Sequence, residues 1–214
     1  KIPFTYSIAT NLDSEHLDFY KNINNLKKCF TKFIEKTPSV GKGFVCNDDQ
    51  NLKNIIRKTK NKNFYTYGKD KKSNFQIVNI KQTSNFSSFD IKINIPSKKK
   101  IIKRIKLPMI GIHNIRNATA AISLAFTIGL PEKCIKAGLY NFKGVQRRFS
   151  HLFDHNKISF YDDYAHHPTE ISSVLSGVEK VYKNKEIVCV FQPHRISRVI
   201  SLKKEFSKCF KKAD

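Results

Sequence analysis

Short apolar runs alternate with amphipathic helical stripes at both ends of this chain, and that order constrains the fold more than any other feature. At the N-terminal end, a short strand expected at 4–10 precedes a stretch over about 22–36 in which apolar residues recur every three or four positions. A second apolar run at 43–46 precedes a helix capped by residues 47–49. Alternation of strands and helices is typical of a parallel sheet covered by helices, so we expect an α/β fold.

The pattern changes between residues 63 and 107, where apolar and polar side chains alternate with a period of two. This alternation predicts antiparallel strands with one face in water. The three lysines at 98–100 are most simply a hairpin turn. Two helices are expected next, over 113–128 and 131–140, because Gly129 can end the first of them.

A second series of strands and helices begins beyond Gly144. We expect two strands and two helices there, alternating in the order 157–163, 169–182, 186–191 and 197–211. We therefore place a domain boundary at Gly144, which divides the chain into residues 1–144 and 145–214. No internal repeat or low-complexity linker is visible in the sequence.

The chain of 214 residues has a formal net charge of +23, from 40 Lys and Arg residues against 17 Asp and Glu residues. Such a charge ordinarily suggests a nucleic-acid or anionic-membrane partner. Here the lysines are spread over nearly every expected element and accompanied by many Asn and Ile residues, as a bias toward AT-rich codons would give. We favour solvated surface lysines and no nucleic-acid partner. A basic nucleic-acid-binding module is the alternative, and it would need lysines gathered on one face or interleaved with stacking aromatic residues.

The five cysteines show no C-x-x-C pair and no zinc-ligand spacing, so we expect reduced thiols in a cytoplasmic protein. No stretch approaches the roughly 20 apolar residues that cross a bilayer, and no membrane partner is expected. The chain starts at Lys1 rather than Met, and both ends have the composition of structured segments. We therefore expect a fragment of a longer protein.

The densest group of functional side chains lies at 161–170, where the sequence reads Tyr-Asp-Asp-Tyr-Ala-His-His-Pro-Thr-Glu. Pro168 suits the first turn of a helix, and it disfavours helical backbone at His167. The segment is therefore expected as a loop between a strand and a helix. Because open α/β sheets bind ligands at the ends of their strands, we expect an active-site loop here.

Two polar motifs lie in the first part of the chain. His16 follows the first expected strand among several acidic residues, and imidazole with nearby carboxylates is a common set of metal ligands. A surface histidine or helix cap would explain His16 equally simply. The motif at 111–118, Gly-Ile-His-Asn-Ile-Arg-Asn-Ala, opens an expected helix, and its asparagine amides suit the edges of a purine. A plain capped helix is the alternative.

Two arginine motifs lie in the second part. Arg147 and Arg148 follow a glycine turn, and their guanidinium groups fit either phosphate oxygens or an interdomain salt bridge. Arg195 and Arg198 are three residues apart at the start of an expected helix, so both can converge on one carboxylate or phosphate. If the two expected strands of this part are parallel neighbours, these arginines face the same crevice as the loop at 161–170.

These motifs, in this order and spacing, resemble those of the Mur ligases of peptidoglycan synthesis. The residues that carry the resemblance lie at 10–18, 113–118, 144–149, 162–170 and 191–195. The resemblance implies a three-domain enzyme that uses ATP and Mg²⁺. It also implies that this chain covers the latter part of a central P-loop-type ATPase domain, with a small antiparallel portion, and the first half of a Rossmann-like C-terminal domain. The nearest member joins L-alanine to the lactyl carboxylate of UDP-N-acetylmuramate through an acyl phosphate.

The resemblance also implies roles for individual residues. The residues implied to contact ATP or its magnesium are His16 for the metal, Asn114 and Asn117 for the adenine, Arg148 for the phosphates and Asp163 for the ribose. The residues implied to surround L-alanine are Tyr164, His166, Arg195 and Arg198. His16, Arg148 and His166 are the expected catalytic residues among them.

The chain departs from the family pattern in two ways. Glu15 stands where the family usually has Asp before its metal-binding histidine. The phosphate loop G-x-x-x-x-G-K-[ST] is absent, and Gly41-Lys42-Gly43 precedes a strand rather than a helix, so we expect this fragment alone to be inactive. The run Gln192-Pro193-His194-Arg195 favours the alanine-adding member over the murein-peptide recycling ligase, which shares a similar histidine loop. A non-catalytic homologue is a further alternative.

Overall fold

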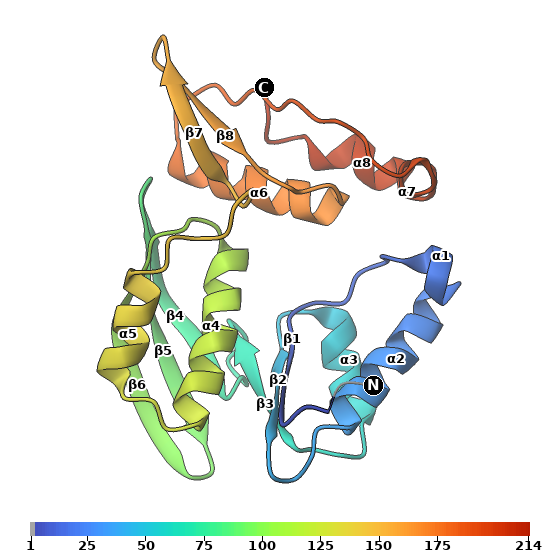
Figure 1. Ribbon diagram of the computed structural model, residues 1–214, viewed down its shortest axis with the longest axis vertical. Coiled ribbons are helices and arrows are strands. Elements are labelled where there is room, and N and C mark those ends of the chain that lie inside the picture. The colour runs from blue at the N-terminus through green and yellow to red at the C-terminus, as the bar shows by residue number, and fades with distance from the viewer. Residues whose placement is uncertain (1–2) are drawn as a thin grey trace.

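The computed structural model describes residues 3–214, except for the side chain of Asp18 (Figure 1). Its first part contains β1 (Tyr6–Ala9), α1 (Leu17–Tyr20), α2 (Ile23–Glu35), β2 (Lys42–Cys46), α3 (Gln50–Lys58), β3 (Phe64–Gly68), β4 (Phe75–Gln82), β5 (Ser87–Ile95), β6 (Lys98–Leu107), α4 (Ile112–Thr127) and α5 (Glu132–Tyr140). The second part contains β7 (Ser150–His155), β8 (Ile158–Asp162), α6 (Pro168–Val181), α7 (Ile196–Ser201) and α8 (Lys203–Cys209). The α/β class expected from the sequence is confirmed.

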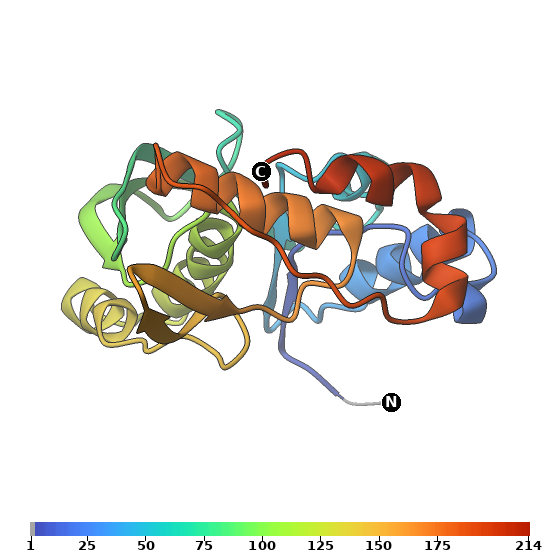
Figure 2. The ribbon, with the colours of Figure 1, turned by 90° about the horizontal axis from the view of Figure 1, so that it is seen from above.

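One six-stranded sheet organises the first part, with its strands in the order β1-β2-β3-β4-β5-β6. Neighbours from β1 to β4 are parallel, and the β4–β5 and β5–β6 pairs are antiparallel. Helices α2 and α3 lie on one side of β1–β3, and α4 lies on the other (Figures 1 and 2). Phe44 and Phe75 of the sheet, Leu52 of α3 and Ile115 of α4 are fully buried and belong to one core.

The helices of this part form where the sequence predicts them because their signals are local. Asn22 caps α2 by accepting a hydrogen bond from the backbone N–H of Asn25 at 2.9 Å, and Leu26 and Ile34 carry the apolar stripe into the core. Asp49 likewise caps α3. The predicted helices at 113–128 and 131–140 correspond to α4 and α5.

Two expectations for the middle of the chain are wrong. The region from residue 63 is not wholly antiparallel, because β3 is parallel to both β2 and β4. Helix α3 connects β2 to β3, and a connection through a helix lets the second strand run parallel to the first. The lysines at 98–100 lie in β6, opposite residues 93–95 of β5, and the turn is formed by Pro96 and Ser97. Proline favours such a turn because its ring fixes φ.

The second part departs further from its expected parallel pattern. Strand β8 forms as predicted, but it pairs antiparallel with β7, a strand that the sequence analysis did not predict. The expected strand at 186–191 is not formed among the described residues: the backbone of Ile187 pairs with Asp214 rather than with another strand, and Val190 is 95% exposed. The single helix expected at 197–211 is divided at Leu202 into α7 and α8.

Helix α6 of the second part approaches the start of α4 closely. A Cβ atom added to Gly177 of α6 would lie 3.2 Å from the Cα of Gly111, the residue that precedes α4. Gly111 itself has φ +91°, a conformation that favours glycine. Among residues 3–214, no helix is both long and apolar enough to cross a membrane.

Candidate functional site

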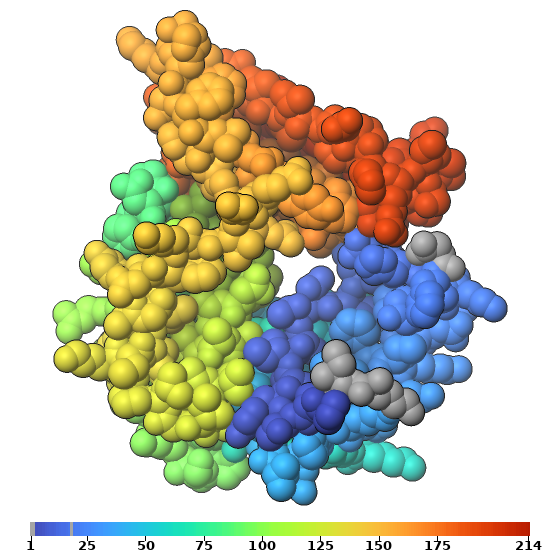
Figure 3. Space-filling view, viewed as in Figure 1, coloured from blue at the N-terminus to red at the C-terminus, as the bar shows by residue number. Residues whose placement is uncertain are grey.

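A cleft of about 780 Å³ lies between the two parts of the chain. Its walls come from the loop after β1, the end of β2, the first turns of α4, residues 145–149 and the loop that leads into α6. Figure 3 shows the hollow between the N-terminal part and the overlying C-terminal part. The loops after β1 and β2 follow the carboxyl ends of parallel strands, which is where open α/β sheets bind their ligands.

Helix α4 presents an amide-bearing face to the cleft. Asn114 and Asn117 both line it and, being three residues apart, lie on the same side of the helix. The Asn114 side chain donates a hydrogen bond from Nδ2 to the carbonyl of Ile110 at 2.7 Å, which fixes the orientation of its amide. His113 also lines the cleft, and its buried Nδ1 has no hydrogen-bond partner. Burial holds the pKa of His113 below its usual value, although the negative charge of Asp163 opposes this shift.

Asp48 and Arg116 form a cluster at the cleft that the sequence analysis missed. The Asp48 carboxylate accepts hydrogen bonds from the backbone N–H groups of Lys69 at 2.8 Å and Asp70 at 3.0 Å, and from Nε of Arg116 at 2.7 Å. It therefore ties the ends of β2 and β3 to α4. From the sequence, Asp48 is expected only as part of a helix cap. The presence of Arg116 within the motif at 111–118 is the only sign in the sequence that a carboxylate lies nearby.

Arg148 and Asp163 line the opposite wall. Arg148 approaches Glu170, with Nη1 4.0 Å from Oε1, and its side chain is half exposed. The Asp163 carboxylate accepts backbone hydrogen bonds from Phe149 and Ala165, each at 2.7 Å. It thereby joins the segment that carries Arg148 to the histidine loop, and the two expected nucleotide contacts share one wall.

The histidine loop at 161–170 is held by the start of α6. Glu170 and the N-cap residue His167 form a capping box, in which Oε2 of Glu170 accepts hydrogen bonds from the N–H groups of His166 at 3.1 Å and His167 at 3.3 Å. His167 is 4% exposed, and its Nε2 has no partner. Nδ1 of His166 lies 2.8 Å from the carbonyl of Tyr164, which can only accept, so Nδ1 carries the proton.

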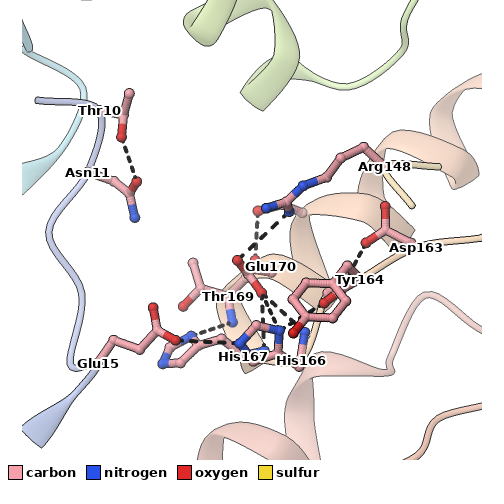
Figure 4. A network of polar contacts seen from close by, with 12 residues as sticks. Thr10, Asn11, Glu15, Arg148, Asp163, Tyr164, His166, His167, Thr169 and Glu170 are labelled. Atoms are coloured by element: carbon pink, nitrogen blue, oxygen red, sulfur yellow. Dashed lines mark hydrogen bonds and ion pairs between the residues drawn. The ribbon is translucent and has the colours of Figure 1, made fainter. Parts of the chain in front are cut away.

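Two acids of the loop after β1 contact the second part directly, and Figure 4 shows one of them, Glu15, beside His166. Asp13 accepts a hydrogen bond from the hydroxyl of Thr169, and its Oδ2 lies 3.8 Å from Nδ1 of His167. Glu15 accepts a hydrogen bond at Oε1 from Nη2 of Arg198 at 3.0 Å, and the same oxygen lies 3.6 Å from Nε2 of His166. Neither the Asp13 nor the Glu15 contact was predicted from the sequence.

The structure therefore brings together some of the predicted site residues and not others. Those that line the cleft are Asn114, Asn117, Arg148 and Asp163. Four others lie outside the lining: His166 and Arg198 meet at Glu15, which lines the cleft, Tyr164 is half exposed, and Arg195 is exposed at the start of α7. Arg198 meets the histidine loop from α7 and not through a pair of parallel strands: β8 forms, but the strand expected at 186–191 is absent from the described structure.

His16 immediately precedes α1, its backbone is left-handed with φ 56°, and its side chain is exposed outside the cleft lining. Within the part of the chain that the structure describes, no three His, Cys, Asp or Glu side chains gather as a metal site. His16 as a metal ligand thus stays a prediction.

Comparison with known proteins gives a consistent picture. The Mur ligase middle domain matches residues 1–125, and the Mur ligase glutamate ligase domain matches residues 147–214. A UDP-N-acetylmuramate–L-alanine ligase of Pelagibacter ubique is 60% identical over 214 residues, which are all of this chain and 46% of that protein. A second enzyme of that name, from Mesorhizobium japonicum, is 37% identical over the whole chain and 46% of its own length. The chain thus spans about half the length of the curated relatives it matches.

Solved structures agree with this assignment. The structure of a UDP-N-acetylmuramate–alanine ligase of Thermotoga maritima aligns with 98% of this chain over 44% of the length of that enzyme, with a TM-score of 0.74 and 29% identity. A murein peptide ligase of Psychrobacter arcticus matches 98% of this chain and 42% of its own, with a TM-score of 0.65 and 25% identity. Because the middle-domain match alone covers more than half of the residues, the chain belongs to the Mur ligase family.

Proposed function

We propose that the full-length protein is a cytoplasmic, ATP-dependent ligase that joins L-alanine to the lactyl carboxylate of UDP-N-acetylmuramate through an acyl phosphate. The observation that carries this proposal is the 60% identity, over all 214 residues, to a ligase of that name. The cleft supports it because it places an amide-bearing helix, an arginine and a carboxylate around one space, with a second arginine group at its mouth.

The residues of the cleft fit a nucleotide. The amides of Asn114 and Asn117 can both donate to and accept from a purine edge, and Asp163 can accept hydrogen bonds from ribose hydroxyls. Arg148 is half exposed beside them and supplies the positive charge that phosphate oxygens require. The unpartnered Nδ1 of His113 is a buried polar atom that a bound ligand could satisfy. We assign ATP to this wall on the chemistry of these groups.

The described residues do not by themselves form a magnesium site. His16 is exposed, and no set of three candidate ligands gathers in the described part of the chain. His16 as a Mg²⁺ ligand rests on the family resemblance, and we derive no step through the metal.

The mouth of the cleft fits an amino acid. Arg198 and Arg195 stand at the start of α7, where guanidinium groups can hold a carboxylate. His166 and Tyr164 lie on the facing loop, with their rings 5.0 Å apart. Fixing the carboxylate of L-alanine would direct its amine toward the cleft, where positioning alone lowers the barrier to attack. His166 would then contact the amine as it loses its proton.

The murein peptide ligase reaction is the second candidate, because a solved enzyme of that name is 25% identical and covers 98% of this chain. Such an enzyme would consume a peptide in place of L-alanine. The two candidates therefore differ in which acceptor supports turnover.

The test is phosphate release by the full-length protein with ATP, Mg²⁺ and UDP-N-acetylmuramate. We expect release to depend on L-alanine and to yield UDP-N-acetylmuramoyl-L-alanine. Release that requires a peptide would favour the second candidate, and no release with either acceptor would contradict both.

A further inference from the structure

Glu15 makes an ionic contact that nothing in the proposed reaction requires. Its Oε1 accepts from Nη2 of Arg198 at 3.0 Å and lies 3.6 Å from Nε2 of His166. Arg198 is separated from Glu15 by 183 residues, so this pair joins the N-terminal part to α7. Both partners of Glu15 are residues that the proposed function assigns to the amino acid. One carboxylate of the protein therefore touches two groups expected to hold the ligand.

The surroundings of Arg198 restrict how a second carboxylate could bind. The Arg198 side chain is 9% exposed, and its Nη1 is buried with no hydrogen-bond partner. An incoming carboxylate cannot reach Nη1 from solvent without moving the groups that cover it. Two carboxylates on one poorly solvated guanidinium would also repel each other at short range. The amino acid and Glu15 are thus alternatives at Arg198 rather than partners.

We propose that, in the absence of amino acid, the Glu15 carboxylate occupies the place on Arg198 that the carboxylate of the amino acid takes. This inference rests on the proposed function. The amino acid binds by displacing Glu15, which releases α7 from the loop after β1. Apparent affinity for the amino acid is then reduced by the fraction of molecules in which Glu15 holds Arg198.

The length of the Glu15 side chain gives the contact its reach. Aspartate, which the family usually carries before its histidine, is one methylene shorter and would retain the charge. With the Arg198 contact at 3.0 Å, the loss of one methylene pulls the carboxylate out of hydrogen-bond range. Substitution by Asp therefore separates the effect of contact from that of charge.

The experiment measures the KM for L-alanine in phosphate release by the full-length protein, with ATP and UDP-N-acetylmuramate saturating. We expect Glu15→Gln and Glu15→Asp each to lower this KM about three- to tenfold, because Arg198 becomes available more often. The matched control is Glu179→Gln, which removes an ion pair with Lys212 at 2.7 Å in the second part and should leave the KM unchanged.

Two results would overturn the inference. An unchanged KM in both Glu15 variants would show that the Glu15–Arg198 ion pair has only a structural role. A raised KM would show that Glu15 positions Arg198 for binding the amino acid. If a variant does not turn over, calorimetric titration of L-alanine with UDP-N-acetylmuramate and a non-hydrolysable ATP analogue gives the same comparison as Kd. Loss of L-alanine dependence in the unsubstituted protein would refute the proposed function, whereas normal L-alanine dependence with either of these two results refutes only the Glu15 inference.

Discussion

The two parts of the chain, residues 3–144 and 145–214, show the same alternating strand and helix signals, yet only the first builds a large core. In the first part, strands and helices bury Phe44, Leu52, Phe75 and Ile115 completely. In the second, the buried cluster consists of Ile171, Leu175, Phe206 and Cys209. A sequence pattern typical of a strand therefore forms a strand only where neighbouring strands hydrogen-bond to its backbone, as they do for β1–β6.

The largest expected effect tests the core of the first part. Phe44→Ala should lower the free energy of unfolding by about 3–5 kcal/mol, because it empties a fully buried site between the sheet and its helices. Urea denaturation followed by circular dichroism measures this change. Val190→Ala in the second part, at a side chain 95% exposed, should change it by less than about 0.5 kcal/mol. Equal losses would contradict the contrast between the two parts.

The next effect tests the cluster that joins the sheet to α4. Asp48→Asn should lower the free energy of unfolding by about 1–3 kcal/mol, because a carboxylate whose side chain is 9% exposed loses its ion pair with Arg116. We also expect a higher KM for ATP, since α4 carries the asparagines of the cleft. Glu179→Gln is the control, because Glu179 and its partner Lys212 are both more than 40% exposed and such pairs contribute little. A loss as large in the control would show that Asp48 has no special role.

The smallest effect depends on pH and on His113. Its folded-state pKa lies below the unfolded value of about 6.5, because burial disfavours the charged ring. The folded state therefore binds fewer protons than the unfolded state. The contribution of His113 to the free energy of unfolding is complete above pH about 6.5, and it is lost as the pH falls through and below that value. His113→Asn should flatten the fall of unfolding free energy between pH 7 and 5. His155→Asn, at an exposed histidine of β7, should leave the fall unchanged.

Local signals account for what the sequence predicted correctly. Helices α2 and α3 have capping residues, Asn22 and Asp49, within three positions of the N–H groups they satisfy, and an apolar stripe fixes which face is buried. Helix α6, which follows the histidine loop, is set in the same way by Pro168 and the capping box.

What the sequence could not provide was pairing between distant segments. Period-two alternation describes one strand, and it does not distinguish β3, which is parallel to its neighbours, from β5, which is antiparallel. The same limit applies to the site. Contacts such as Asp48 with Arg116 and Glu15 with Arg198 join residues 68 and 183 positions apart, and no local pattern encodes them.

In the proposed function the two substrates bind to different parts of the molecule, ATP on the wall of α4 and the amino acid at the start of α7. The most direct test is the pair of KM values, for ATP and for L-alanine, in full-length protein carrying Arg195→Ala. We predict that the L-alanine KM rises more than about tenfold while the ATP KM stays within twofold, since a guanidinium that holds a carboxylate contributes strongly to binding. An unchanged L-alanine KM, or an equal rise in both constants, would contradict this division.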